Sequence, residues 1–148
     1  ADGELVPVNI LIDEGSDSTL FCTALVRRLQ LAGQKQTLIM EGVGEESSTH
    51  RNLEYLEMKL KTALCEIVTI HGSTMPSIAK LVRIVDWEKL IKRWAHLIDF
   101  PPFRVCSGRI YILIGLDHAA LITPIESRFG RNDEPTASKT RIGWTLQG

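Results

Sequence analysis

The stretch Asn9-Ile10-Leu11-Ile12-Asp13-Glu14-Gly15-Ser16-Asp17-Ser18 decides the fold of this 148-residue chain. Its first half is apolar and rich in β-branched residues, which predicts a strand over residues 8–12, and its second half holds residues typical of tight turns. Asp13 therefore lies where the strand ends, a position that holds a carboxylate in place. An ordinary strand-to-helix turn, with Asp13 or Ser16 as the helix N-cap, explains the same residues equally well.

A carboxylate in this position has a specific catalytic use when it is paired. Two carboxylates that share one proton can activate a water molecule and protonate a leaving amine, because like charges about 3 Å apart cannot both ionise. The chain has a single Asp-x-Gly-Ser turn. A catalytic role for Asp13 therefore requires a twofold homodimer, which also fits the short chain.

The composition indicates one globular domain over residues 1–148. The chain is 44% hydrophobic and 24% charged, which suits one buried core rather than two domains. Its net charge of −1 gives no bulk attraction to nucleic acid or anionic lipid. No apolar run approaches about 18 residues and no signal-peptide pattern is present, so we expect no membrane partner.

Two further features concern the setting of the chain. Cys22, Cys65 and Cys106 are widely spaced, without the pattern of a disulfide framework or a zinc site, which favours a reducing intracellular setting. The chain begins with Ala1 rather than Met, and we expect a fragment excised from a longer polyprotein.

The rest of the chain alternates strand and helix patterns, with a helix expected directly after the first turn. The predicted helices cover residues 18–29, 86–100 and 116–122, and the predicted strands cover residues 36–40, 52–60, 63–70, 109–114 and 139–148. The first two of these strands form a hairpin around the glycine-rich bend 41–46, while residues 75–85 stay unassigned. We assign the two tryptophans of the 86–100 helix to a core face rather than to nucleic-acid or membrane binding. In the last strand, Ile142, Trp144 and Leu146 are expected on one face.

The order of these segments resembles that of retropepsins, the homodimeric aspartic proteases of retroviruses and retrotransposons. It looks most like the peptidase domain of BEL/Pao-type LTR retrotransposon polyproteins. The narrower likeness rests on Leu-Ile-Asp-x-Gly-Ser-x-Ser-Thr-Leu, Trp94-x-His96-Leu97, Ile112-Leu113-Ile114-Gly115-x-Asp117-His118 and Ile142-Gly143-Trp144-x-Leu146-x-Gly148. It covers residues 8–148 and implies a mainly β, retropepsin-like barrel with a dimer interface made by terminal strands.

The resemblance also implies a role for each matching residue. Asp13 would be the catalytic aspartate, paired with Asp13 of a second chain around the attacking water. The residues implied to support this catalytic loop are Glu14, Gly15 and Ser16 in the turn and Leu113, Ile114 and Gly115 in the late strand. The residues implied to contact substrate are Asp17, at its backbone, and Gly42, Val43 and Gly44, at the tip of a closing flap.

The implied activity is processing of a retroelement polyprotein, with no cofactor and no metal. The implied partners are a second copy of the chain and a peptide substrate, without nucleic acid or membrane. The expected location is the cytoplasm, including the interior of retroelement particles.

Two departures from the retropepsin pattern bear on activity. Glu14 stands where retropepsins carry Ser or Thr, whose hydroxyl bonds across the dimer, and an ionised carboxylate can only accept. Two copies of Glu14 beside two copies of Asp13 would oppose dimerisation unless Glu14 is protonated, exposed, or paired with Arg27 or Arg109. Leu116-Asp117 replaces the usual Arg-Asn, so an ion pair to Asp17 is absent or made differently.

These departures leave two hypotheses: an acid-favouring endopeptidase, and a non-cleaving dimerisation or peptide-binding module. Other chemistries have little support, because Gly-x-Ser-x-Gly is absent and Gly42-x-Gly44 lacks the third glycine of a dinucleotide loop. Cys-His catalysis would need a chance approach in space. The four histidines, His50, His71, His96 and His118, lack metal-ligand spacing.

Overall fold

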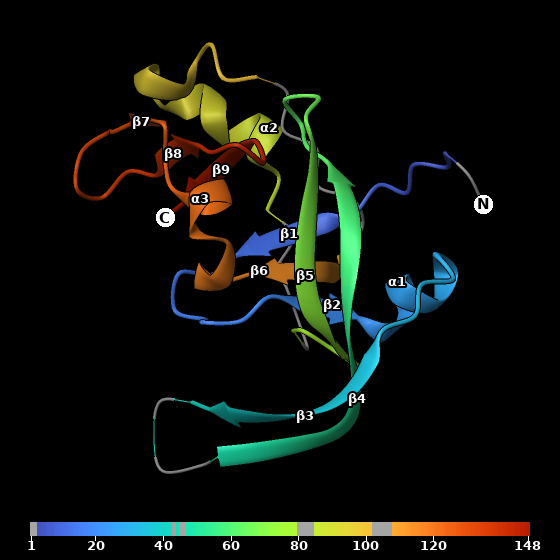
Figure 1. The fold of residues 1–148 in the computed structure, drawn as a ribbon. Helices are drawn as coiled ribbons and strands as arrows, with labels where there is room; N and C mark the ends of the chain where they lie inside the picture. Colours follow the sequence, from blue (N-terminus) through green and yellow to red (C-terminus); the bar gives the residue numbers. More distant parts are fainter. Residues whose placement is uncertain (1–2, 43, 45–46, 80–84, 102–107) are drawn as a thin grey trace.

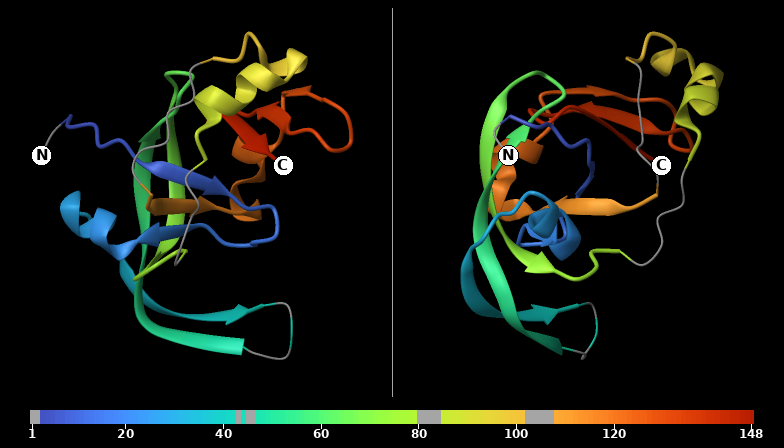
Figure 2. Two further views of the ribbon diagram at one scale, coloured as in Figure 1. Left: turned by 180° about the vertical axis from the view of Figure 1, so that it is seen from behind. Right: turned by 90° about the vertical axis from the view of Figure 1, so that its right-hand side faces the viewer.

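The chain folds into a mainly β structure with two sheets (Figure 1). The computed structural model describes residues 3–42, 44, 47–79, 85–101 and 108–148. The larger sheet has six strands in the order β1-β6-β2-β5-β4-β3, and the smaller one has the order β7-β8-β9. In the right-hand view of Figure 2 the long strands β4 and β5 curve around the rest of the molecule, so the larger sheet curls into half a barrel. The prediction of a mainly β fold is confirmed.

Strand β1 (Asn9–Ile12) forms as predicted and pairs in parallel with β6 (Ile110–Ile114). The last matched pair is Ile12 with Ile114, directly before Asp13. Strand β6 lies inside the sheet between β1 and β2, and it is increasingly buried along its length because its apolar side chains pack into core clusters on both faces. The strand predicted over 109–114 is therefore also confirmed.

The helix predicted over residues 18–29 is wrong in its first half. Residues Leu20–Cys22 form strand β2, and the helix α1 covers only Thr23–Arg28. The three residues of β2 are buried, and they pair antiparallel with β6 on one side and parallel with β5 on the other. Pairing on both edges inside the sheet decides the local structure here, which spacing along the sequence could not show.

The path of β1 and β2 around β6 positions the candidate site. The two strands are consecutive along the chain, yet β6 lies between them in the sheet. The connection over residues 13–19 must therefore pass around the end of β6. This path brings the Asp13 turn against residues 114–118, almost a hundred positions later in the sequence.

The predicted hairpin is confirmed as β3 (Gln34–Glu41) and β4 (Ser47–Lys61), which are longer than expected. Strand β5 (Ile67–Met75) follows after a turn in which the Thr62 N–H donates to the Glu66 carbonyl at 2.8 Å. The strand predicted over 63–70 therefore starts later and extends further. Residues 80–84, part of the unassigned segment, and Cys106 lie outside the described residues.

The helix predicted over residues 86–100 is wrong as a continuous element. It is divided into α2 (Trp87–Leu90), η1 (Ile91–Arg93) and η2 (Ala95–Leu97), because Trp94 is extended, with φ −117° and ψ 123°. The break allows Leu97 and Phe100 to pack on the small sheet beside Ile91 and Ala137. Trp87 and Trp94 pack against the same cluster, so the predicted core role of the tryptophans is confirmed.

The C-terminal elements are shorter than predicted. The short helix expected over 116–122 is present as η3 (Leu116–His118) and α3 (Ala119–Ile122). The strand predicted over 139–148 is confirmed only for its second half, which forms β9 (Trp144–Gln147). The strands β7 (Glu126–Arg128) and β8 (Thr136–Lys139) were not predicted, and the three strands form an antiparallel sheet.

The chain reverses between β8 and β9, where the Thr140 N–H donates to the Gly143 carbonyl at 2.9 Å and Gly143 has φ +147°. Ile142 in this turn packs on the large core, whereas Trp144 and Leu146 pack on the small cluster, so the three do not share a face. None of the helices in the described part of the chain has the length and apolar content needed to cross a bilayer.

Candidate functional site

The Asp13 turn is held by its own backbone and by β6. The Asp13 N–H donates to the Ile114 carbonyl at 3.1 Å, which continues the parallel pairing. The Gly15 N–H donates to Asp13 Oδ1 at 2.9 Å, and the Ser16 N–H donates to the Asp13 carbonyl at 3.2 Å. The half-buried carboxylate is therefore fixed in orientation by the turn that follows it. Neither Asp13 nor Ser16 caps a helix, because α1 has Cys22 as its N-cap residue.

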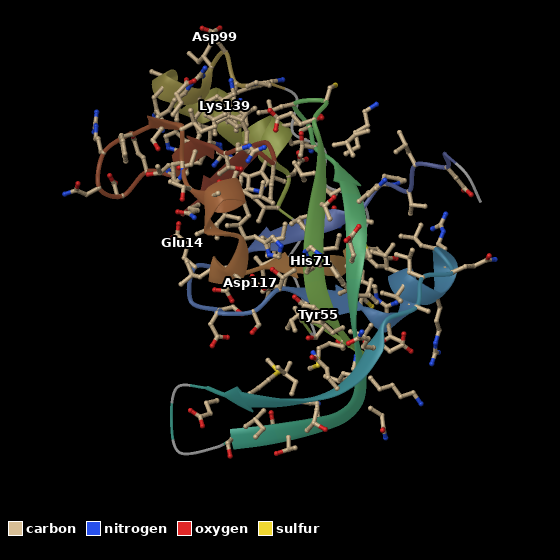
Figure 3. All side chains as sticks on the ribbon, in the orientation of Figure 1. Glu14, Tyr55, His71, Asp99, Asp117 and Lys139 are labelled. Atoms are coloured by element: carbon tan, nitrogen blue, oxygen red, sulfur yellow. The ribbon has the colours of Figure 1, made fainter. Side chains whose placement is uncertain are left out.

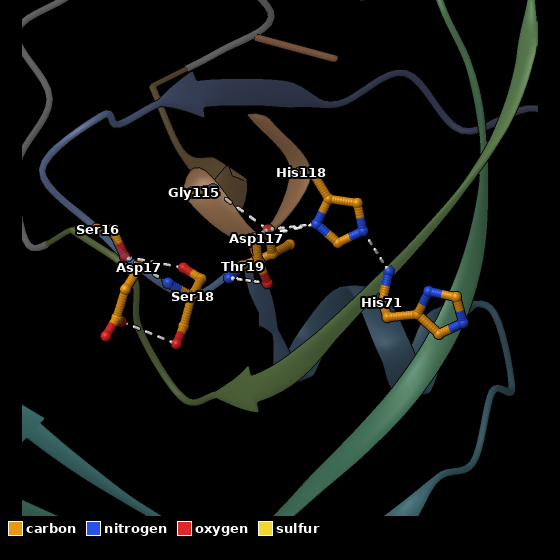
Figure 4. A network of polar contacts seen from close by, with 8 residues as sticks. All are labelled: Ser16, Asp17, Ser18, Thr19, His71, Gly115, Asp117 and His118. Carbon is orange, nitrogen blue, oxygen red and sulfur yellow. Dashed lines mark hydrogen bonds and ion pairs between the residues drawn. The ribbon is translucent and has the colours of Figure 1, made fainter. Parts of the chain in front are cut away.

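The second half of the turn is tied together by hydroxyl groups (Figure 4). Ser16 Oγ donates to the Ser18 carbonyl at 2.8 Å and accepts from the Ser18 N–H at 3.3 Å. Ser18 Oγ donates to Asp17 Oδ1 at 3.0 Å. The Ser16 carbonyl accepts from the Leu116 N–H at 2.8 Å, which joins the turn to the segment after β6.

Gly115 permits this close approach. A Cβ atom at Gly115 would lie 2.7 Å from the Ser16 carbonyl oxygen and 2.8 Å from that of Ser18, far inside ordinary contact distance. Leu113 and Ile114, which precede it, are buried under the turn with exposed fractions of 7% and 0%. The structure therefore brings together the two segments that the resemblance placed in one catalytic loop.

Thr19 and Asp117 join these segments, and sequence reasoning did not single out Thr19. The buried Thr19 donates its N–H to Asp117 Oδ2 at 2.9 Å and its hydroxyl to Asp117 Oδ1 at 2.7 Å. Thr19 Oγ1 also accepts from the Gly115 N–H at 3.2 Å. Asp117 is thus bonded to Thr19, and no ion pair to Asp17 exists among the described residues.

His118 extends this network to strand β5. Its Nδ1 lies 3.1 Å from Thr19 Oγ1 and 3.2 Å from Asp117 Oδ1. Its Nε2 accepts from the main-chain N–H of His71 at 3.1 Å. Figure 4 shows these contacts as a chain of polar groups from Thr19 and Asp117 through the His118 ring to the backbone of β5.

Glu14 is exposed at the edge of the turn (Figure 3). Helix α1, which carries Arg27, lies on the other side of the molecule in this view. In the part of the chain that the structure describes, no ion pair joins Glu14 to Arg27 or Arg109. Glu14 is therefore exposed to solvent in the single chain rather than paired with either arginine.

The turn end of the β3–β4 hairpin, where β3 ends and β4 begins, lies on the same side of the molecule as the Asp13 turn in Figures 1 and 2. Gly42 and Gly44 are exposed there, with no atom within 4 Å of an added Cβ, and Gly44 has φ +122°. Val43 lies outside the described residues. Further along β3, Leu38 and Met40 pack against the cluster that contains Leu20 of β2 and Leu113 of β6, so the inner face of the hairpin is apolar. The buried members of that cluster are Leu20, Leu53, Met75 and Leu113.

Other candidate sites in the described part of the chain lack convergent chemistry. No group of three or more His, Cys, Asp or Glu side chains there could hold a metal ion. A groove of about 890 Å³ lies between the segment before β1 and the β8–β9 turn, and its lining is mostly apolar and does not include Asp13. The polar contacts described above join residues 16–19 to residues 115–118, directly after the Asp13 turn.

Comparisons of the chain with protein-family models, curated proteins and solved structures find no match.

Proposed function

We propose that the chain is one half of a homodimeric aspartic endopeptidase. The substrate class we assign is the polyprotein of a retroelement, as the resemblance to retropepsins implies. The observation that carries the proposal is the placement of Asp13 at the end of β1, with its carboxylate held by Gly15 and its backbone bonded to β6. An immobilised carboxylate at the surface of one chain can pair with its copy in a second chain.

In the dimer, the two Asp13 carboxyl groups share one proton and hold a water molecule between them. The ionised carboxyl takes a proton from the water as the water oxygen attacks the scissile carbonyl carbon, while the protonated carboxyl gives its proton to the carbonyl oxygen. The resulting diol collapses when a proton passes to the peptide nitrogen and the C–N bond breaks. The products are a carboxylic acid and an amine, and the dyad regains its single shared proton.

The β3–β4 hairpin supplies the closing element of this proposal. Its apolar inner face, which includes Leu38 and Met40, is turned toward the strands that carry the Asp13 turn. A hairpin that closes over an extended peptide excludes water and holds the scissile bond in place. Gly42 and Gly44 allow the backbone changes that closure requires, because among the described residues no atom lies within 4 Å of a Cβ added at either position.

Exposed Glu14 favours a second candidate, a non-cleaving module that dimerises or binds peptides. Two Glu14 and two Asp13 side chains near one axis would repel each other at neutral pH. If that repulsion prevents the dyad from forming, the fold would keep a peptide-binding surface without catalysis.

Cleavage of a fluorogenic peptide library by concentrated protein, from about pH 4 to about pH 7, separates the two candidates. Asp13→Asn should reduce the rate by roughly 100-fold or more, since the shared proton is lost. Asp99→Asn is the matched control, because Asp99 is exposed and lies far from Glu14 in Figure 3. No cleavage at any pH by wild-type protein that sediments as a dimer would favour the non-cleaving module.

A further inference from the structure

The two ring nitrogens of His118 have different partners. A main-chain N–H can only donate, so the 3.1 Å contact from His71 N requires a lone pair on His118 Nε2. The ring proton is therefore on Nδ1, which faces Thr19 Oγ1 and Asp117 Oδ1. The ring is mostly buried, with an exposed side-chain fraction of 14%, so these partners are not readily replaced by water.

The hydrogen bonds of Thr19 agree with this assignment. The Thr19 hydroxyl proton points to Asp117 Oδ1 at 2.7 Å, which leaves the oxygen free to accept. It can then accept from both the Gly115 N–H and the His118 Nδ1–H. With the proton on Nδ1, every polar atom of this group has a partner of the correct kind.

We propose that His118 is a positioning residue that, as the neutral Nδ1–H tautomer, locks the Asp13 turn to strand β5. The lock runs from β5 through the ring to Thr19, and from Thr19 to the turn that ends in Ser18. Its effect on catalysis rests on the proposed function, whereas the lock itself does not. Protonation of the ring would place an N–H at Nε2 opposite the N–H of His71 and break this one contact, while the pairing of β5 with β2 and β4 would remain.

Several charged or titratable groups surround the ring. Asp117 of the same segment contacts Nδ1, and the His71 ring of β5 stacks on the His118 ring at 6.4 Å between centroids. Glu57 of β4 lies 3.3 Å from His71 Nε2, and Tyr55 of β4 stacks on the other side of His71. Arg141, which contacts Glu66, lines the depression beside Asp117 and His118.

His96 provides an internal comparison. Its side chain is similarly buried, with an exposed fraction of 16%, but its Nε2 lies 2.8 Å from the Pro135 carbonyl oxygen. A carbonyl can only accept, so His96 Nε2 carries a proton. The chain should therefore contain two buried histidines with opposite proton positions at Nε2.

The first test is long-range ¹H–¹⁵N NMR of the wild-type protein near neutral pH, which reports the protonation of each ring nitrogen. We expect an unprotonated Nε2 in His118 and a protonated Nε2 in His96. A protonated Nε2 in His118 would overturn the proposal. On acidification, the protection factor of the His71 amide, which is its intrinsic exchange rate at that pH divided by the observed rate, should fall about tenfold once both His118 nitrogens are protonated. An unchanged protection factor at that point would contradict the lock.

Two substitutions separate the halves of the lock. His118→Gln keeps an oxygen near the Nε2 position and should keep the protection factor of the His71 amide unchanged as the pH is lowered. His118→Asn is too short to reach β5 and should lower that protection factor about tenfold, while His96→Gln, the matched control, should leave it unchanged. Equal protection factors in the Gln and Asn variants would refute the role of Nε2.

Catalysis gives an independent readout. In an active dimer, His118→Asn should lower kcat about tenfold with little change in KM, because the variant displaces the Asp13 carboxylate and leaves the substrate pockets in place. Rescue by His118→Gln is expected. Absence of Asp13-dependent cleavage by the wild type would refute the proposed function and leave the NMR result standing.

Discussion

Replacing Thr19 with Val should destabilise the chain by about 3 kcal/mol. The change keeps the shape of the side chain but removes the hydroxyl that donates to Asp117 Oδ1 at 2.7 Å and accepts from the Gly115 N–H at 3.2 Å. A hydrogen bond to a charged group contributes about 1.5–3 kcal/mol, and a buried N–H without a partner costs about 1–3 kcal/mol. We take a value near the lower end of the sum of these two contributions, because the Asp117 side chain is 33% exposed and can bind water.

Urea unfolding followed by tryptophan fluorescence measures this loss as a lower midpoint at unchanged slope. For a chain of 148 residues the same loss corresponds to a melting temperature roughly 9 °C lower. Thr19→Ser keeps the hydroxyl and should lose about 1 kcal/mol through the missing methyl group. Thr69→Val, at an exposed position of β5, should stay within about 0.5 kcal/mol of wild type. A Thr19→Val variant as stable as Thr69→Val would refute the stabilising role of the Thr19 hydrogen bonds to Asp117 and Gly115.

Further predictions concern the close approach at β6, the dimer axis and the divided helical segment. Gly115→Ala should cost about 1–3 kcal/mol in urea unfolding, because its Cβ meets two carbonyl oxygens, whereas Gly42→Ala, with free space around it, should change stability by less than about 0.5 kcal/mol. Glu14→Thr should tighten dimerisation about tenfold at neutral pH, measured by sedimentation equilibrium, and should raise the cleavage rate at that pH. If neither dimerisation nor cleavage changes, the proposed repulsion between Glu14 side chains is refuted. Leu97→Ala should lower the free energy of unfolding by about 2–5 kcal/mol, because Leu97 is fully buried although it lies in a short 3₁₀ turn. Ile98→Ala, at a position that is 64% exposed, should change it little. Equal losses in the two variants would contradict the assignment of Leu97 to the core.

Alternating or continuous apolar runs predicted β1, the β3–β4 hairpin and β6, whereas β2, β7 and β8 were missed. The β3–β4 hairpin and the central strand β6 follow directly from such runs and from the glycines that separate them. The 86–100 segment shows the limit of this reasoning. Its spacing placed Ile91, Leu97 and the two tryptophans against a core correctly, but Ile98 at the same helical spacing is 64% exposed. The extended backbone at Trp94 depends on the small sheet that Leu97 and Phe100 cover. Periodicity indicates which side is buried and does not show that the backbone is continuous.

The candidate site was only partly accessible from the sequence. Asp13, Gly15 and Gly115 stand out because a carboxylate or a glycine directly follows an apolar strand. Thr19 does not stand out, because its importance comes from Asp117, which lies 98 positions away and is brought close only by the pairing of β6 between β1 and β2. No local pattern encodes that pairing.

The insertion of β6 between β1 and β2 has a consequence for the order of events during synthesis. A ribosome that has produced residues 1–100 has made Asp13 and the whole β3–β4 hairpin, but not the strand on which the Asp13 turn rests. Contacts of such long sequence separation form late and slowly, since a large loop must close before they are made. The carboxylate of a nascent chain is therefore not yet in its final geometry, and assembly of the turn waits for residues 110–118. The candidate site is therefore completed only after most of the domain has been translated.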